Sequence, residues 1–329
     1  MSVKSMQALQ VQAPNGALTR IELPLPDAKP GHVVVKVRAS GINPLDLKIR
    51  AGTAAHAQHP FPAVLGMDLA GEVYAVGEGV TQFAVGDSVW AMAGGVAGVQ
   101  GSMAEFACVD AQLLAHMPSN LSMREAAALP LVAITAWEGM VDIANVRSGD
   151  KVLVIGAAGG VGHIALQLAR ARDAKTFGID SAKASDYLRS IGATPISRDT
   201  PVHEYLNEHT DGKGFDVVYD CVGALDTAFQ SVRPFGTVTS SLGWGTHSLA
   251  PLSFRSARYA GVFTLRPLLT GEGRQSHGNI LQEIKALVEK GAIHPRLDGH
   301  RFAFDDAEAA HEWVRSGRAV GKVVISIAD

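Results

Sequence analysis

The sequence contains few cysteines and no long hydrophobic run. Two cysteines, Cys108 and Cys221, occur among 329 residues, too few for a disulfide framework or a four-cysteine zinc lobe. The longest apolar stretches, 126–137 and 152–162, fall short of the ~20 residues that a membrane-spanning helix requires. The N-terminal residues lack the apolar core of a signal peptide. We therefore expect a soluble, cytoplasmic protein.

A marked excess of either charge is also missing. The chain has 29 basic and 32 acidic residues, a net charge of −3, and no basic cluster, so nucleic acid is not an expected partner. Hydrophobic residues make up 47% of the sequence and charged residues 19%, which predicts large buried cores rather than disorder. The length predicts two domains, since a usual domain has ~100 to 200 residues.

The hydrophobic pattern changes along the chain. Up to about residue 122, short apolar runs such as 33–37, 71–76 and 86–92 are separated by Gly and Pro, which predicts twisted antiparallel β structure. The Ala/Leu-rich segment 123–136 indicates a helix, and from Lys151 strands alternate with helices. The expected strands cover 151–155, 176–179, 215–219 and 236–240, and the expected helices 160–172 and 182–191. This alternation predicts an α/β fold with a doubly wound parallel sheet.

The last 60 or so residues begin with an amphipathic pattern that predicts a helix over 279–290. Asp305 and Glu308 have the spacing of a D-x-x-E capping box before a helix that runs through Trp313. Residues 322–327 predict a final strand. Because no helix follows that strand, we expect it to return to the first domain.

A glycine-rich loop, 156–162, lies between the first predicted parallel strand and its helix. Glycine allows backbone to approach a pyrophosphate closely, and the N–H groups at the helix start bind its oxygens. We therefore expect this loop to bind a dinucleotide, through Ala158, Gly159, Gly160, Val161 and Gly162. The alternative is a tight strand-to-helix turn without a ligand.

Asp180 ends the second predicted parallel strand. A carboxylate there would bind the adenosine ribose and repel a 2′-phosphate, which favours NAD. Lys183 and Arg198 lie close by in sequence, and either could instead bind the 2′-phosphate of NADP. Asp180 could also be no more than a helix cap.

Several strings along the whole chain resemble the medium-chain dehydrogenase/reductase superfamily, in particular its zinc-independent quinone oxidoreductase (zeta-crystallin-like) and enone reductase group. These strings are 39–46, 65–73, 85–89, 126–130, 157–162 and 321–324. The resemblance implies a GroES-like β-rich catalytic domain formed by 1–122 and 272–329. It implies a Rossmann domain at 123–271, and a homodimer.

The resemblance also implies further cofactor contacts. Thr135 would hold the nicotinamide carboxamide, and Asn43 would line the substrate side of the ring, although each could instead serve packing or a turn. Val222, Gly223, Ser241 and Leu242 follow strand ends, where folds of this kind bind ligands.

Zinc is not expected. Zinc-dependent relatives carry Cys where this chain has Asn43 and His where it has Met67, and neither substitute binds Zn²⁺ well. His56 and His59 form an H-x-x-H without an evident third ligand, so we expect both histidines to be solvated and to bind no metal.

Without a Lewis acid, hydride addition to an activated alkene or quinone fits better than reduction of a plain carbonyl group. Lys48 could stabilise the resulting enolate, or it could be a solvated lysine. The expected function is an NAD(P)H-dependent quinone or enone reductase with a small-molecule substrate. The alternatives are a zinc-free alcohol dehydrogenase and a non-catalytic NADPH-binding protein of the crystallin or regulatory kind.

Overall fold

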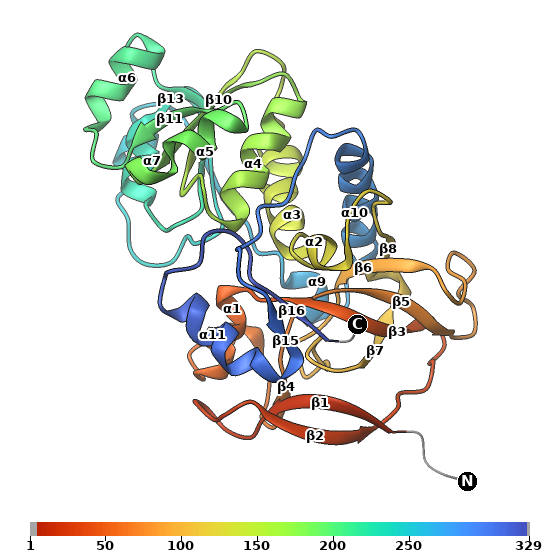
Figure 1. Ribbon diagram of the computed structural model, residues 1–329. Helices are drawn as coiled ribbons and strands as arrows, with labels where there is room; N and C mark the ends of the chain where they lie inside the picture. The colour runs from red at the N-terminus through yellow and green to blue at the C-terminus, as the bar shows by residue number, and fades with distance from the viewer. Residues whose placement is uncertain (1–4, 328–329) are drawn as a thin grey trace. The chain divides into compact units, whose positions relative to one another are not determined.

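A computed structural model describes residues 5–327 and divides the chain into two compact units (Figure 1). Unit 1 holds the described residues up to 131, together with 265–290 and those from 295 onward. Unit 2 holds 132–264 and 291–294. Within residues 5–327, every helix is too short or too polar to cross a membrane.

Unit 1 is rich in β structure. Its largest sheet has the order β15-β16-β3-β5-β6-β8, with β7 also paired to β3, and a second sheet has the order β2-β1-β4. The strands are β1 (Ser5–Val11), β2 (Thr19–Pro24), β3 (His32–Gly41), β4 (Ala63–Val64), β5 (Asp68–Val76), β6 (Ser88–Met92), β7 (Phe106–Asp110), β8 (Ala115–His116), β15 (Phe302–Ala303) and β16 (Val324–Ser326).

Short helices accompany these sheets, and the longest is α10. They are α1 (Pro44–Arg50), α2 (Met123–Ala127), α9 (Arg266–Thr270), α10 (Arg274–Glu289) and α11 (Ala307–Arg315), with 3₁₀ turns η1 (Ala55–Ala57), η2 (Ala111–Leu113) and η5 (Phe304–Asp306). Helices α1 and α11 contact each other within the unit (Figure 1). As predicted, the last strand, β16, joins this sheet, where it pairs antiparallel with β3.

In strand β3, valines occupy successive positions instead of alternating with polar residues. Val33, Val34, Val35 and Val37 are all completely buried. Irregularities in the pairing of β3 with β5, after Val34 and after Val37, shift the register. The first irregularity skips a residue of β5, so the valines of β3 still alternate between its two faces, and their complete burial shows that both faces of the strand are covered.

Unit 2 contains a parallel sheet with the order β11-β10-β9-β12-β13-β14. This is the strand order 3-2-1-4-5-6 of the doubly wound dinucleotide-binding fold. The strands are β9 (Lys151–Ile155), β10 (Lys175–Asp180), β11 (Thr194–Ser197), β12 (Phe215–Asp220), β13 (Val232–Ser240) and β14 (Arg258–Gly261). The predicted α/β fold class is confirmed.

Helices cover this sheet (Figure 1). Helix α4 (Gly160–Ala171) packs on β9 and β10, α5 (Ser185–Ser190) on β11, and α7 (Leu225–Ser231) on β12 and β13. The remaining helical elements are α3 (Pro130–Trp137), most of which belongs to this unit, α6 (Val202–Thr210), α8 (Ala250–Ser253), the 3₁₀ turn η4 (Ala182–Ala184) and a π-helix, η3 (Glu138–Ile143). The core beneath them includes Leu153, Phe177, Phe215, Val218 and Phe229.

Two sequence-based expectations are corrected. The Ala/Leu-rich segment is not one helix: α2 ends at Ala127 and α3 (Pro130–Trp137) begins at Pro130, because proline cannot continue a helix but suits its first turn. The capping box at Asp305 and Glu308 is also wrong. Asp306 accepts the bond from the Ala303 N–H instead (2.9 Å), and Asp305 and Glu308 form ion pairs with arginines.

Candidate functional site

The glycine loop of unit 2 leads directly into helix α4. Gly159 is the residue before the first helical turn, and Gly156 has a φ of +79°. A Cβ at Gly162 would lie 2.2 Å from the Gly156 carbonyl oxygen, so only glycine lets the helix start this close to the turn. The free N–H groups of such a helix start bind anions. The loop therefore has the cradle that a dinucleotide pyrophosphate needs.

Asp180, at the end of β10, holds this loop. Its Oδ2 accepts from the Ala158 N–H (2.8 Å) and its Oδ1 from the Ser181 N–H (2.7 Å). Arg198 follows β11 and pairs with Oδ1 at 3.2 Å, while 61% of its side chain stays exposed. Lys183 is exposed on η4. Asp180 is thus more than a helix cap, because it fixes the glycine loop.

Asp220, at the end of β12, organises a second loop beside the first. Its fully buried carboxylate accepts from the N–H groups of Val222, Gly223 and Ala224 at 2.9–3.1 Å, and from the Ser240 hydroxyl at 2.8 Å. No role is predicted for Asp220 from the sequence, although an aspartate at a strand end is a recognisable signal. Two loops therefore meet where the strand order reverses, between β9 and β12.

The predicted cofactor residues gather at these loops. Gly156 lies so close to Val222 that a Cβ on Gly156 would be 2.4 Å from the Val222 Cγ1. The position of a Cβ on Gly223 lies 3.5 Å from the carbonyl oxygen of Leu242, and the Ser241 N–H donates to the Asp220 carbonyl (3.2 Å).

Thr135 is buried in α3 and takes part in a polar network. The Thr264 hydroxyl lies 3.1 Å from the Thr135 hydroxyl and 2.7 Å from a Glu138 carboxylate oxygen. The Tyr219 hydroxyl donates to the Thr135 carbonyl (2.9 Å). This network orients the Thr135 side chain, and Thr264 and Glu138 carry no sequence motif that could have identified them.

Asn43 lies in unit 1, at the start of α1, and is 1% exposed. Its Nδ2 donates to Asp68 Oδ2 (2.9 Å), and its Oδ1 accepts a short bond from Lys322 Nζ. Lys322 also donates to the Ile42 carbonyl (2.8 Å). The Asn43 amide is therefore held in one orientation by a buried acid and a buried amine.

Asp46 completes this buried cluster. Its carboxylate accepts from the N–H groups of Asn43 (2.8 Å) and Gly66 (3.2 Å). Burial raises the pKa of Asp46 to about 7 and that of Asp68 to about 6, while burial lowers the pKa of Lys322. The cause is desolvation, which disfavours the charged form of each group. Two acids and one amine thus share a site with little access to water.

Lys48 differs from this cluster because it is exposed on α1. An exposed position agrees both with stabilisation of the enolate and with a solvated surface lysine. The catalytic role of Lys48 stays a prediction.

The residues at the expected zinc positions do not fit a zinc ion. The amide of Asn43 is engaged on both sides, and Met67 is a fully buried thioether. Among the residues that the structure describes, no group of three or more His, Cys, Asp or Glu side chains could hold a metal.

Comparisons with known proteins agree with this geometry. A family described as an alcohol dehydrogenase GroES-like domain matches residues 29–119, and one described as a zinc-binding dehydrogenase matches 191–325. The chain is 35% identical over 314 residues to a protein named 2-methylene-furan-3-one reductase from Solanum lycopersicum, covering 92% of this chain and 73% of that one. The chain belongs to the medium-chain dehydrogenase/reductase superfamily.

The chain is also similar to other proteins of this kind, in sequence and in structure. A protein named NADPH-dependent alkenal/one oxidoreductase, chloroplastic, from Arabidopsis thaliana is 32% identical over 92% of this chain and 73% of its own length. The crystal structure of an alcohol dehydrogenase superfamily protein from Novosphingobium aromaticivorans has a TM-score of 0.97 at 50% identity, covering 98% of this chain and all of that one. A quinone oxidoreductase from Coxiella burnetii has a TM-score of 0.81 at 26% identity, covering 99% and 100%.

These findings confirm the predicted superfamily, its GroES-like and Rossmann folds, and an oxidoreductase that uses a nicotinamide cofactor and a small-molecule substrate. The roles of the individual site residues stay predictions.

Proposed function

We propose that this chain is a zinc-independent, NAD(P)H-dependent reductase of quinones and α,β-unsaturated carbonyl compounds. The observation that carries the proposal is the match, over nine tenths of the chain, to enzymes named as reductases of conjugated carbonyl compounds. The engaged amide of Asn43 and the thioether of Met67 support it, because these groups are poor substitutes for zinc ligands.

The residues of unit 2 have separate tasks in this proposal. The start of α4 binds the pyrophosphate through backbone N–H groups, and Asp180 and Asp220 hold the two loops in place for it. Thr135, fixed by Thr264, binds the carboxamide end. When bound, the cofactor would supply a hydride to the conjugated substrate, so that negative charge would develop on the substrate's conjugated oxygen until a proton is added to complete the reduction.

The residues of unit 1 act on the substrate. Asn43 is assigned to the substrate side of the nicotinamide, with its amide orientation set by Lys322 and Asp68. Lys48 is assigned to stabilise the oxyanion, since an ammonium group interacts far more strongly with an enolate than with a neutral ketone.

Steady-state turnover with a matched pair of substrates tests the function. We expect NADPH oxidation with methyl vinyl ketone and with a simple quinone, and none with ethyl methyl ketone, which lacks only the conjugated double bond. Reduction of the saturated ketone, or oxidation of primary alcohols, would indicate an alcohol dehydrogenase. Tight NADPH binding without turnover of any substrate would indicate a non-catalytic protein.

We further propose NADPH as the preferred cofactor. Both oxygens of Asp180 already accept bonds from the protein, which weakens its ability to bind ribose hydroxyls. The exposed guanidinium of Arg198 and the ammonium of Lys183 are available for a 2′-phosphate.

Arg198→Ala tests this preference. We expect the KM for NADPH to rise by roughly 10-fold or more, as expected for a lost charged hydrogen bond of ~1.5–3 kcal/mol, with the KM for NADH unchanged. Arg189→Ala is the control, because Arg189 is equally exposed but pairs with Asp186 on α5. Equal changes with both cofactors would argue against a 2′-phosphate site. A homodimer and a cytoplasmic location stay predictions.

A further inference from the structure

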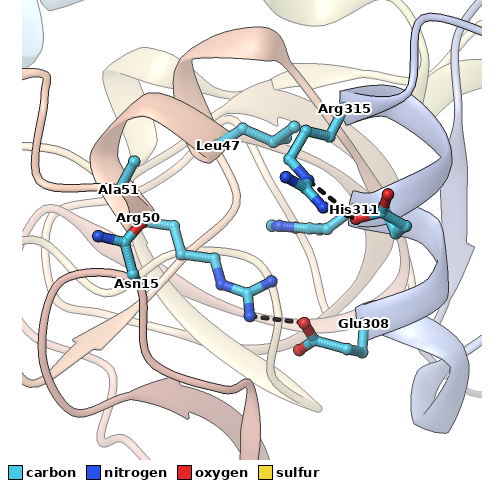
Figure 2. Close-up of a pocket in the computed structure, with 8 residues that line it drawn as sticks. Asn15, Leu47, Arg50, Ala51, Glu308, His311 and Arg315 are labelled. Carbon is cyan, nitrogen blue, oxygen red and sulfur yellow. Dashed lines mark hydrogen bonds and ion pairs between the residues drawn. The ribbon is translucent and has the colours of Figure 1, made fainter.

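Unit 1 contains a pocket of about 260 Å³ (Figure 2). One wall comes from α1 and the other from α11, and Asn15 of the loop between β1 and β2 borders it. The lining residues are Asn15, Leu47, Arg50, Ala51, Glu308, His311, Glu312 and Arg315. All eight belong to unit 1, and none has a task in the proposed reductase reaction.

His311 is the unusual residue of this pocket. It projects from α11 toward Arg50 (Figure 2) and is only 2% exposed. Neither of its ring nitrogens has a hydrogen-bond partner among residues 5–327. Buried polar groups without partners are rare, because each loses its hydration without a compensating hydrogen bond. Because His311 lines the pocket, a ligand bound there could supply the missing partner.

The two arginines of the pocket also have unused donors. Arg50 donates from Nε to the Gly16 carbonyl (2.9 Å) and from Nη2 to Glu308 (2.6 Å). Arg315 uses Nε and Nη2 for Glu312 (2.8 and 2.5 Å). In the described part of the chain, the Nη1 group of each arginine has no partner. Three side chains that line one cavity thus have nitrogen atoms without a hydrogen-bond partner.

We propose that this pocket binds a small molecule with a carboxylate group, which accepts hydrogen bonds from His311, Arg50 and Arg315. The methylene and methyl groups of Leu47 and Ala51 would contact the rest of the molecule. The acceptor is assigned as an oxyanion because arginine nitrogens only donate.

Charge balance selects a carboxylate over a phosphate. The charged groups that face His311 are Arg50 from α1, and Glu308, Glu312 and Arg315 from α11, and their formal charges cancel. A single negative charge is balanced if His311 takes up one proton from solvent on binding. A phosphate dianion would leave one charge unbalanced in a partly enclosed site, which is costly.

The titration of His311 provides a readout of this balance. Burial, assisted by the charge of Arg50, lowers the pKa of the free imidazole to about 4. An adjacent carboxylate favours the protonated ring and raises that pKa. Binding is therefore expected to take up a proton and to weaken as pH rises.

Calorimetric titration of the full chain with butyrate, at pH ~6 and ~8, tests the proposal, with inorganic phosphate as the second ligand. We expect butyrate to bind at least several-fold more tightly at the lower pH. At pH ~8, where inorganic phosphate is mainly the dianion, we expect butyrate to bind more tightly than phosphate. Proton uptake is measured by repeating the titration in buffers with different ionisation enthalpies. Equal affinity at both pH values, tighter binding of phosphate, or no binding of butyrate would overturn the proposal.

Two variants separate the pocket from general surface binding. His311→Leu removes the unpartnered ring at similar volume, so we expect a stable fold and a loss of butyrate affinity of at least 10-fold. Arg315→Met, at a side chain that is 73% exposed, keeps the test decisive if the histidine variant fails to fold. Arg318→Met is its control, because Arg318 lies over Trp313 and outside the pocket. Wild-type affinity in Arg315→Met would also overturn the proposal.

Discussion

Asp68 and Asp220 are both completely buried, and each binds donors from separate segments of its own unit. Asp68 accepts from the Asn43 amide and from the Leu131 N–H (2.8 Å). Asp220 accepts from three consecutive N–H groups after β12. Such carboxylates determine local geometry, because a buried carboxylate is stable only where donors from several segments are held around it.

Lys322→Met should therefore destabilise unit 1. The ammonium lies 3.9 Å from Asp68 Oδ2 and lowers the pKa of that acid, against the larger effect of burial. We expect the free energy of unfolding to fall by about 3–5 kcal/mol near pH 8, as measured by urea denaturation.

The pH dependence of that loss follows from the direction of the Asp68 shift. Its folded pKa, about 6, exceeds the ordinary 3.8, so stability falls as pH rises between these values and is constant above them. Without Lys322 the pKa rises further, and the fall extends to higher pH. The variant should thus lose more stability at pH ~8 than at pH ~5, and Asp68→Asn in the same chain should restore part of it. An equal loss at both pH values would contradict this account.

Lys48→Met tests the proposed oxyanion partner. If the ammonium stabilises the enolate, kcat for enone reduction should fall by roughly 10- to 1,000-fold, the range for one oxyanion donor, with the cofactor Kd nearly unchanged. Lys29→Met, at another exposed lysine of unit 1, is the control. An unaltered kcat would leave Lys48 as a solvated surface residue.

At the residue scale, the sequence identified the groups that follow a local rule. The glycine loop and Asp180 have fixed positions relative to a strand and a helix, and the structure brings them together. Asp46, Asp68 and Lys322 were seen only as parts of family-like strings. The contacts among these three residues join positions far apart in the sequence. No local pattern predicts that the Lys322 ammonium lies beside the buried acids Asp46 and Asp68.

Helix α4 depends on the size of one glycine side chain. Gly162→Ala would place a Cβ 2.2 Å from the Gly156 carbonyl and 2.9 Å from the Ala157 Cα, and neither backbone atom can move without opening the turn. We expect lower thermal stability and a dinucleotide Kd raised by at least 10-fold, measured by calorimetry.

Gly299→Ala is the matched control, because a Cβ at that position meets no atom within 4 Å and its φ is not positive. It should leave the Tm and the Kd unchanged. Wild-type affinity in Gly162→Ala would show that the loop does not constrain the ligand.

Elements were predicted best where periodicity and flanking glycines agreed, as for β9, β12 and α4. Element ends were predicted less well. Strand β13 begins at Val232 rather than 236, and α10 begins at Arg274 rather than 279, because polar residues that tertiary contacts bring into an element do not continue its hydrophobic pattern. The π-helix η3 was not expected, since its wider turn leaves no signature in amphipathic spacing.

For the whole molecule, we predict activity without zinc, because Asn43 and Met67 occupy the positions at which zinc-dependent relatives carry zinc ligands. Purified protein should contain no stoichiometric zinc by elemental analysis, and a chelator should leave enone reduction unchanged. One tightly bound zinc ion per chain, with activity lost on its removal, would require a different mechanism from the one proposed.

The division of the chain into interleaved segments has a consequence for synthesis on the ribosome. The parallel sheet of unit 2 is complete once residue 261 has emerged, because all six strands lie between Lys151 and Gly261. The sheet of unit 1 still lacks β15 and β16 at that time. Residues 39–41 of β3 pair with β5 on one side, but the side that pairs with 324–326 is still open. At ~5–20 residues per second, that open edge persists for seconds in the nascent chain. The unit translated first is thus finished last, and until then one edge of β3 exposes unpaired backbone N–H and C=O groups that could pair with another chain.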